Sequence, residues 1–470
     1  MTTSELHYLD VSEASERIRE GALSPVELTE ALLARIEELN PQLKAYERVT
    51  PELAMQQARE AEDEIKHGRW RGVLHGIPIA LKDNIATREY ACGNGMVVPI
   101  PQLRGVDSGV AASLRQSGAV LLGKLRQTEG AFIEHHPSVA EPVNPWNADA
   151  WCGVSSSGAG VATAAGLCFA ALGTDTGGSI RMPCDMNGVT GMKPTYGRVS
   201  RYGVIGNSPS LDHVGPLARS VRDVAAVMSV ITGPDPKDPT STGPKWNPHA
   251  TGSVGKGIRV GVDEQFAFGG VEAEVVTVLR DALDVLKRCG AQIVAIRFPR
   301  VEPVVDAWVI QSSIEMAGVH ADTFEQSEGH YGPALKGFIQ LGRSMDFTHY
   351  QRAAAVRDEF RGQLSEVFNT VDVILLPTQS LAGPSSARMH ELLANPGNVA
   401  QLARYTCAFD MAGSPLLILP GGHTAGGVPI SFQLIGPALG EEQLIALGSA
   451  HQDATDWHRD RPPIRKQAVS

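Results

Sequence analysis

The pattern of apolar and polar positions predicts a chain in which helices and strands alternate. After Ser24 the sequence has a proline, a glutamate and apolar residues at helical spacing, so a helix is expected over 25–40. A second helix is expected over 51–67, closed by Gly68. The apolar run 77–81 is the first convincing strand.

Beyond residue 81 the same analysis predicts further strands and helices in turn. Helices are expected over 109–117, 157–165 and 271–288, and strands over 119–122, 169–172, 258–262, 292–298, 371–376, 416–419 and 430–434. Such alternation is typical of an α/β protein. The predicted fold is a large mixed, mostly parallel β-sheet flanked by helices on both faces.

The proposed domain organisation is one domain over 1–470. Its expected parts are N-terminal helices (1–70), a central core (71–232), a surface linker (233–257) and a C-terminal part that completes the sheet (258–470). The linker is predicted from a Pro/Gly/Ser/Thr-rich stretch without helical or strand periodicity. It could also mark a domain boundary, but the later strands need a sheet to join.

Composition and charge narrow the classes of partner. The 470 residues are 43% hydrophobic and 20% charged, as in ordinary globular proteins, and the net charge is −11. This sign disfavours a nucleic-acid partner, although it leaves a local basic patch open. The six cysteines form no C-x-x-C pair, so reduced thiols are expected. No leader or membrane segment is evident, and the expected location is the cytoplasm.

Two Gly/Ser-rich clusters carry the most unusual composition, at 153–158 and 173–181. The run Thr176-Gly177-Gly178-Ser179 could form a nest of N–H groups that binds a phosphate or a transient oxyanion. Each cluster alone could equally be a flexible loop. Neither a phosphate-loop motif nor a G-x-S-x-G motif occurs here, which disfavours nucleotide binding and a histidine-based serine triad.

Lys82 could activate a serine in place of a histidine. It ends the apolar strand over 77–81, so its amine is expected at the carboxyl edge of the sheet, where open α/β folds place ligands. Burial there would lower its pKa from about 10.4 toward 7 or 8 and make it a base near neutral pH. The alternative is a solvated or salt-bridged lysine at the end of a strand.

The segment 72–222 closely resembles the amidase signature hydrolases, with weaker echoes over 372–378 and 426–436. The most specific part is 153–194, which includes Gly173-Thr174-Asp175-Thr176-Gly177-Gly178-Ser179-Ile180-Arg181 and Gly191-Met192-Lys193-Pro194-Thr195. The resemblance implies the fold of that family, with Ser179 as nucleophile, Ser155 as the serine of a cis peptide and Lys82 as base.

One position departs from the family pattern. Val154 stands where the family usually has a second glycine before the bridging serine, so the local turn could differ. Ser156 and Ser157 are alternatives for the bridge, but the interval of 24 residues between Ser155 and Ser179 favours Ser155.

The resemblance also implies a mechanism without metal or organic cofactor. Ser179 would attack the carbonyl after giving its proton through Ser155 to Lys82. The backbone N–H groups of Thr176, Gly177, Gly178 and Ser179 would stabilise the oxyanion. Asp175 and Arg181 would support the loop as a polar pair.

Other residues are candidates of lower rank. His135 and His136 are interpreted as loop residues beside the pocket rather than as metal ligands. Cys152 and Cys184 are interpreted as small buried residues rather than nucleophiles. Apolar residues in two loops predict a hydrophobic substrate pocket that includes Met96, Phe132 and Ile133.

The predicted function is hydrolysis of an amide bond in small neutral, hydrophobic or aryl substrates, with carbamates and esters as further candidates. The alternative within the family is the catalytic subunit of a glutamine-hydrolysing amidotransferase. The alternative from another class is a ligand-binding homologue without activity. The partner expected is a small-molecule amide or carbamate, and a homodimer is left open.

Overall fold

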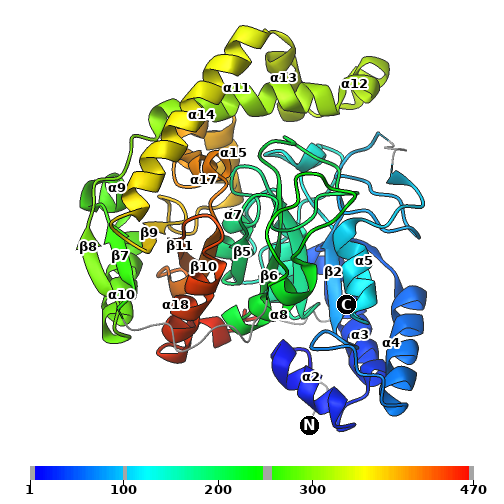
Figure 1. Cartoon of the computed structure of the whole chain (residues 1–470). Coiled ribbons are helices and arrows are strands. Elements are labelled where there is room, and N and C mark those ends of the chain that lie inside the picture. Colours follow the sequence, from blue (N-terminus) through cyan, green and yellow to red (C-terminus); the bar gives the residue numbers. More distant parts are fainter. Residues whose placement is uncertain (1–5, 99–102, 247–256, 465–470) are drawn as a thin grey trace.

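The computed structural model describes residues 6–98, 103–246 and 257–464, and a single eleven-stranded sheet organises them. The strands follow the spatial order β1-β3-β2-β4-β6-β5-β10-β11-β9-β7-β8 (Figure 1). Their bounds are β1 Tyr46–Val49, β2 Pro78–Lys82, β3 Val120–Leu125, β4 Ala170–Asp175, β5 Thr190–Lys193, β6 His213–Ala218, β7 Arg259–Val262, β8 Gln292–Ala295, β9 Val373–Pro377, β10 Leu416–His423 and β11 Pro429–Ile435.

The large mixed α/β sheet is confirmed, but its parallel pairs are the minority. Parallel pairing joins β2 to β3 and β4, and β7 to β8 and β9. The other six neighbouring pairs, from β1 with β3 to β11 with β9, are antiparallel. The expectation of a mostly parallel sheet failed because it took every strand to be followed by a crossover helix. In the centre, β10 instead returns directly as β11 through a short turn.

Seventeen α-helices lie in the described part of the chain. They are α2 Val11–Arg19, α3 Pro25–Leu43, α4 Pro51–Lys66, α5 Gly109–Gln116, α6 Ser157–Ala164, α7 Arg181–Asn187, α8 Val221–Ile231, α9 Glu264–Phe268, α10 Ala273–Arg288, α11 Glu302–Val319, α12 Ala321–Ser327, α13 Pro333–Arg343, α14 Phe347–Phe368, α15 Ser386–Leu393, α16 Pro396–Ala403, α17 Cys407–Ala412 and α18 Glu441–Asp453. Short 3₁₀ turns span Glu129–Ala131, Glu328–His330 and Trp457–Arg459.

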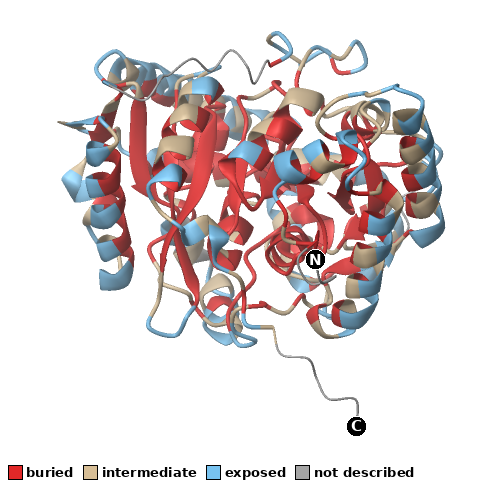
Figure 2. Ribbon diagram, turned by 90° about the horizontal axis from the view of Figure 1, so that it is seen from below, coloured by how far each residue is buried: buried red, intermediate tan, exposed pale blue. Residues whose placement is uncertain are grey.

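These helices sandwich the sheet. Helices α6 and α7 pack on each other and on β4, β10 and β11, while α8, α10 and α18 pack together on β5, β6 and β10. The buried residues consequently form a continuous band through the middle of the molecule, with exposed residues on the outer helices (Figure 2). No helix in the described ranges has the length and apolar character needed to cross a bilayer.

Local sequence explains the best-predicted elements. Ser24 caps α3, because its hydroxyl accepts the N–H groups of Val26 (3.0 Å) and Glu27 (3.2 Å). Helix α6 packs closely on neighbouring backbone, and a Cβ on its Gly158 would lie 2.3 Å from the carbonyl oxygen of Ala45. The small residues of α6 therefore allow close packing rather than forming a flexible loop.

The pattern missed several elements. Strands β1, β5 and β6 and helices α2, α7–α9 and α11–α18 were not predicted, and helices α11–α14 form the layer at the top of Figure 1. The expected linker lies partly outside the described residues, at 247–256. The described part of the linker packs partly on the core, where Trp246 is buried.

Candidate active site

The residues predicted to perform the chemistry come together at the ends of β2 and β4. Strand β2 ends at Lys82, which is fully buried. Its Nζ lies 2.6 Å from Ser155 Oγ and 2.8 Å from Thr174 Oγ1. The Thr174 hydroxyl also accepts a hydrogen bond from Asn84 Nδ2 at 3.2 Å. The lysine is therefore held between two hydroxyl groups in a site closed to bulk water.

The backbone next to Ser155 is hydrogen-bonded to Ser179. The Val154–Ser155 peptide bond is cis, and the Ser156 N–H donates to the Ser179 carbonyl oxygen at 3.2 Å. The Ser155 carbonyl oxygen accepts the N–H of Thr128 at 3.2 Å. Ser155 is buried, whereas Ser179 is half-buried and lines a cavity. The serine expected to attack the substrate is thus the more accessible of the two.

The loop after β4 presents the N–H groups expected to hold the oxyanion. The Gly178 N–H donates to Asp175 Oδ1 at 2.7 Å, so it is already engaged inside the loop. The N–H groups of Gly177 and Ser179 make no hydrogen bond within the described residues. Trp308 of α11 holds the loop from outside by donating its Nε1–H to the Thr176 carbonyl oxygen at 2.9 Å.

A buried ion network fixes this loop to the rest of the protein. Arg181 donates through Nε to Asp175 Oδ2 (3.0 Å) and through a terminal nitrogen to Asp175 Oδ1 (2.7 Å), and it also pairs with Asp410 of α17. All three side chains are fully buried. Burial alone would raise the pKa of Asp175, but the charge and hydrogen bonds of Arg181 hold it well below its usual range.

Asp212 provides a second anchor for the loop. Its carboxylate accepts the Thr176 hydroxyl at 2.6 Å and the N–H groups of Asn207 (3.0 Å) and Ser208 (3.1 Å). It therefore links the loop after β4 to the loop before β6. Burial raises the pKa of Asp212 to about 6 despite these hydrogen bonds.

The electrostatic setting keeps the Lys82 amine partly neutral near pH 7. Burial lowers the pKa of Lys82 to about 7, while the negative charges of Asp175 and Asp212 act in the opposite direction. Desolvation is the larger effect because the ammonium group is removed from water. A substantial fraction of the amine is consequently neutral at pH 7 and can accept a proton.

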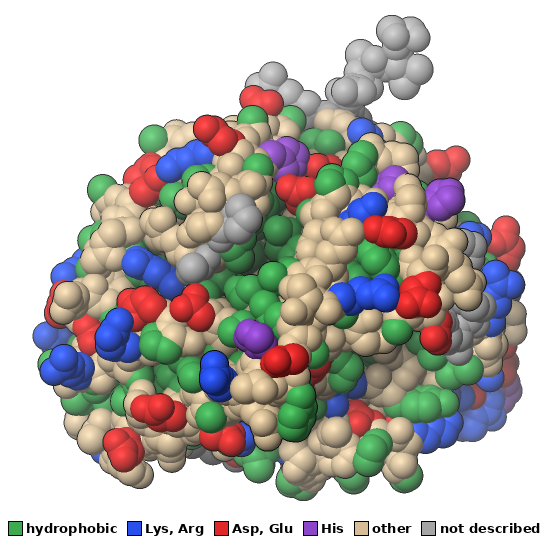
Figure 3. All heavy atoms as spheres, turned by 90° about the horizontal axis from the view of Figure 1, so that it is seen from above, with side chains coloured by type: hydrophobic (Ala, Val, Ile, Leu, Met, Phe, Trp, Pro, Cys, Tyr) green, Lys and Arg blue, Asp and Glu red, His purple; other side chains and the backbone are tan. Residues whose placement is uncertain are grey.

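The cavity beside Ser179 has a mostly apolar lining, and none of the described residues that line it is charged. Its hydrophobic walls are Phe132, Ile133, Trp151, Val154, Met182, Trp308, Met389, Leu393, Val399 and Leu402. The molecule seen from above is hollowed near its middle, and hydrophobic side chains gather in the hollow (Figure 3). The structure thus puts Phe132 and Ile133 at the cavity, and it places Val154 there as well.

Met96 does not line this cavity, which corrects the sequence prediction. It packs with Val98, Phe324 and Leu335 in the apolar cluster of α12 and α13, against which Phe132 of the cavity wall also packs. An apolar loop residue can avoid water by lining a pocket or by packing on another element. Met96 packs on helices that the sequence pattern did not predict. The neighbouring positions 99–102 lie outside the described residues.

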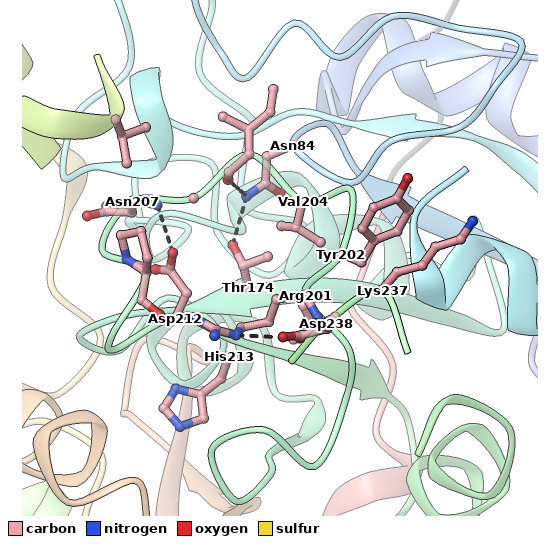
Figure 4. Close-up of a pocket in the computed structure, with 15 residues that line it drawn as sticks. Asn84, Thr174, Arg201, Tyr202, Val204, Asn207, Asp212, His213, Lys237 and Asp238 are labelled. Atoms are coloured by element: carbon pink, nitrogen blue, oxygen red, sulfur yellow. Dashed lines mark hydrogen bonds and ion pairs between the residues drawn. The ribbon is translucent and has the colours of Figure 1, made fainter. Parts of the chain in front are cut away.

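A second, more polar cavity lies beside Thr174. It is lined by Asn84, Thr174, Arg201, Asp212 and neighbouring residues (Figure 4). In Figure 4 the Asn84 amide points at the Thr174 hydroxyl, and Asn207 is joined to Asp212. Asn207 lines both cavities and therefore forms part of the wall between them.

The two histidines singled out from the sequence, His135 and His136, each contact a nearby serine hydroxyl group. His135 Nε2 lies 3.2 Å from Ser157 Oγ in a small neighbouring cavity, and burial lowers the pKa of His135 to about 3. His136 Nδ1 lies 2.7 Å from Ser138 Oγ. The described residues contain no cluster of three His, Cys, Asp or Glu side chains suited to a metal ion.

The two cysteines near the motifs are buried. Cys152 and Cys184 lie in the core, and burial raises the pKa of both thiols. A thiol that stays protonated at neutral pH is a poor nucleophile. This leaves the serines as the nucleophile candidates of the site.

Sequence reasoning missed the supporting residues from distant segments. Thr174 stands within a quoted motif, so its contact with Lys82 could have been suspected from its place at the end of β4. Asp212, Trp308 and Asp410 reach the site from other parts of the chain, and no local spacing links them to it.

The mixed sheet and this site define the class of amidase signature enzymes, and comparison with known proteins agrees. The model of the family described as Amidase matches residues 27–445. The chain is 42% identical over 459 residues to "Putative amidase AmiD" of Mycobacterium tuberculosis, covering 97% of this chain and 96% of the relative. It is 36% identical to a glutamyl-tRNA(Gln) amidotransferase subunit of Chloroflexus aggregans, covering 98% and 100% of the two chains.

A solved structure shows the same architecture. The X-ray structure of native peptide amidase from Stenotrophomonas maltophilia superposes with a TM-score of 0.82 at 29% identity, covering 98% of this chain and 99% of the other. The chain belongs to the Amidase family and is an enzyme that acts on amide bonds.

Proposed function

We propose that the chain hydrolyses amides through a covalent intermediate on Ser179. Neutral Lys82 accepts the proton of Ser155, Ser155 accepts that of Ser179, and Ser179 Oγ forms a bond to the carbonyl carbon. The separation of 2.6 Å between Lys82 Nζ and Ser155 Oγ supports the first transfer. The lowered pKa of Lys82, about 7, keeps much of the amine in the neutral form that can accept a proton near neutral pH.

The negative charge on the carbonyl oxygen then needs donors. The N–H groups of Gly177 and Ser179 have no other partner in the described residues and lie in a loop held by Asp175 and Asp212. One such donor contributes about 2.7 to 4 kcal/mol to transition-state stability in comparable sites. The proton returns through the relay to the leaving amine, and water then cleaves the acyl-enzyme.

The single observation that carries the substrate class is the absence of charge from the cavity that Ser179 lines. Its walls are almost entirely aliphatic, aromatic or thioether side chains. A substrate carboxylate or ammonium group would lose its hydration there without a counter-charge, which costs several kcal/mol. Neutral hydrophobic or aryl amides are therefore the proposed substrates, with aryl carbamates and esters as side activities.

The uncharged lining of the cavity also bears on the alternative function, an amidotransferase subunit. Relatives of that name make this alternative relevant. Free glutamine carries both an ammonium and a carboxylate group, and neither has a counter-charge among the described lining residues. The apolar cavity favours a self-contained amidase. An inactive ligand-binding homologue is disfavoured because Lys82, Ser155 and Ser179 are all present at the site.

A matched pair of substrates tests this proposal. We expect kcat/KM for a neutral aryl amide to exceed that for a carboxylate-bearing amide of similar size by about 100-fold or more, the cost of an unpaired buried charge. Free glutamine is measured alongside them. A preference for the charged amide, or rapid release of ammonia from glutamine, would contradict the proposed substrate class.

A further inference from the structure

Two side-chain amides interrupt the apolar wall of the Ser179 cavity. Asn207 lies in the loop before β6 and Gln379 follows β9, and both line the cavity. Only 6% of Asn207 and 4% of Gln379 is exposed. A buried amide needs hydrogen-bond partners. An amide group of either residue that has no partner in the protein therefore indicates what a bound ligand could supply.

The protein fixes which way each amide points. Asn207 Nδ2 donates to the Ala131 carbonyl oxygen at 2.8 Å, and Gln379 Nε2 donates to Asp185 Oδ2 at 2.7 Å. A backbone carbonyl can only accept, and Gln379 Nε2 also lies 3.1 Å from the thioether sulfur of Met186, which accepts but cannot donate. The amino end of each amide is therefore tied to the protein, and the carbonyl end faces away from that tie.

The two carbonyl oxygens remain free to accept. Neither Asn207 Oδ1 nor Gln379 Oε1 accepts a hydrogen bond from the described residues. Neither oxygen is fully buried, so both are accessible to a ligand. The side-chain oxygens of Gln311 and Gln433, in contrast, are sealed without a partner. The accessible oxygens of Asn207 and Gln379 thus give an apolar cavity two oriented acceptors.

Their anchoring places them near Ser179 and the loop after β4. The Asn207 N–H and the Thr176 hydroxyl share the Asp212 carboxylate, so Asn207 is fixed beside the oxyanion loop. Gln379 is tied to Asp185 of α7, the helix that begins two residues after Ser179. Both contacts belong to the part of the protein that would hold the carbonyl of the acyl group in the proposed mechanism.

We propose that Asn207 and Gln379 form a recognition subsite for N–H groups in the acyl part of the substrate. The enzyme then prefers neutral amides that carry a second, non-scissile N–H donor near the bond that is cleaved, as in an N-acylamino acid amide. A neutral donor fits better than an ammonium group, because two amide oxygens do not offset the desolvation of a full charge. This inference rests on the proposed function and names its substrate class more closely.

The test compares two substrates that differ in one N–H group. N-acetylphenylalanine amide carries the donor, and 2-benzyl-4-oxopentanamide has a CH₂ group in its place; both release ammonia. For the unmodified enzyme we expect kcat/KM to favour the N–H substrate by about 10-fold, since one neutral hydrogen bond is worth roughly 3- to 10-fold and an unmet acceptor adds to it. Equal rates for the two substrates would overturn the proposal.

Variants separate recognition from structural damage. In the double variant Asn207→Leu/Gln379→Met we expect the preference to fall to about 1, because both acceptors are gone. Damage to the fold would lower both rates and leave their ratio unchanged. Met389→Leu, an apolar exchange in the same wall, is the matched control and should keep the ratio of the unmodified enzyme.

The outcomes distinguish this inference from the proposed function. A double variant that keeps the roughly 10-fold preference would overturn the role of the two amides while leaving the serine chemistry in place. Failure of the unmodified enzyme to turn over either compound, together with any other neutral amide, would instead count against the proposed function.

Discussion

At the scale of single residues, the site depends on a lysine that loses its usual charge. Lys82 is fully buried, and its immediate polar partners are the hydroxyls of Ser155 and Thr174. Neither hydroxyl carries a charge that would keep the ammonium form, and the carboxylates of Asp175 and Asp212 only partly offset the burial. The sequence predicted this property from the position of Lys82 at the end of an apolar strand.

The pH dependence of activity follows from that property. In the proposed relay the neutral amine is the active form, and its pKa is lowered to about 7, so kcat/KM should rise about tenfold per pH unit below pH 7 and level off above it. Rates measured from pH 5.5 to 9 with a neutral amide check this. A profile that falls steadily from pH 6 to pH 9 while the protein stays folded would exclude a lysine base.

A variant of Asp212 identifies the group that titrates. Asp212 raises the pKa of Lys82, so Asp212→Asn should move the rising limb to lower pH. The pKa of Asp212 itself is raised to about 6, and it faces Thr176 and the N–H groups of Asn207 and Ser208. If Asp212 were the titrating group, the limb would vanish in this variant rather than shift.

At the scale of elements, the loop after β4 is held in place by charge. Arg181 at the start of α7 joins Asp175 at the end of β4 to Asp410 in α17. Asp175 in turn accepts the N–H groups of Gly178 (2.7 Å) and Ile180 (2.9 Å). The buried ion pairs therefore set the backbone on both sides of Ser179.

Removing the cation should destabilise the protein strongly. Arg181→Met would leave Asp175 buried without its counter-charge, and we expect a loss of about 3 to 5 kcal/mol in the free energy of unfolding. Urea unfolding at pH 7 measures it, with the exposed Arg222→Met as the control. A loss below about 1 kcal/mol would show that the network does not hold the loop.

The same pair sets a pH dependence of stability. The folded-state pKa of Asp175 is lowered, so its contribution is present above the unfolded-state value near 3.8 and is lost as pH falls below it. The Arg181→Met variant should therefore lose less additional stability than the unmodified protein on acidification from pH 5 to pH 3. Parallel losses in the two proteins would assign the acid sensitivity to other groups.

Local sequence signals predicted some elements and not others, for physical reasons. Helix α3 has its cap, proline and apolar stripe within one short segment, and β2 is a continuous apolar run, so both were predicted close to their observed bounds. Strands β5 and β6 include glycine or proline and pair antiparallel in the sheet centre. Their strand character comes from tertiary pairing, which local propensity does not record.

The site shows the same division. Lys82, Ser155 and Ser179 lie in specific motifs and could be named from the sequence. Trp308 and Asp410 could not, because folding alone brings α11 and α17 to the loop after β4. Met96 was misplaced for the related reason that its partners in α12 and α13 were not predicted.

At the scale of the whole molecule, the structure combines a buried cluster of polar side chains with an apolar cavity. One eleven-stranded sheet carries Lys82 and Thr174 at adjoining strands, β2 and β4, so their separation is fixed by backbone pairing. The cavity walls come from α7, α11, α15 and α16 as well as from loops. Variation in these outer walls can change the substrate without disturbing the relay.

The proposed relay requires no metal ion, because in it a lysine and backbone N–H groups supply the base and the electrophilic donors. Prolonged dialysis against a chelator should therefore leave kcat/KM unchanged within about twofold, since no catalytic group is removed. Activity before and after dialysis, with and without added zinc, is the measurement. Activity that is lost and then restored by zinc would contradict the serine and lysine mechanism.

The most direct measurement of the central claim is the site of a covalent adduct. The enzyme is treated with an aryl fluorophosphonate, which reacts with an activated serine, and the modified peptide is mapped by mass spectrometry. The account predicts one adduct, on Ser179, that is absent from Ser179→Ala and forms much more slowly in Lys82→Met, because the relay that activates the hydroxyl is broken. An adduct on Ser155 or another residue, or full inactivation without modification of Ser179, would contradict it.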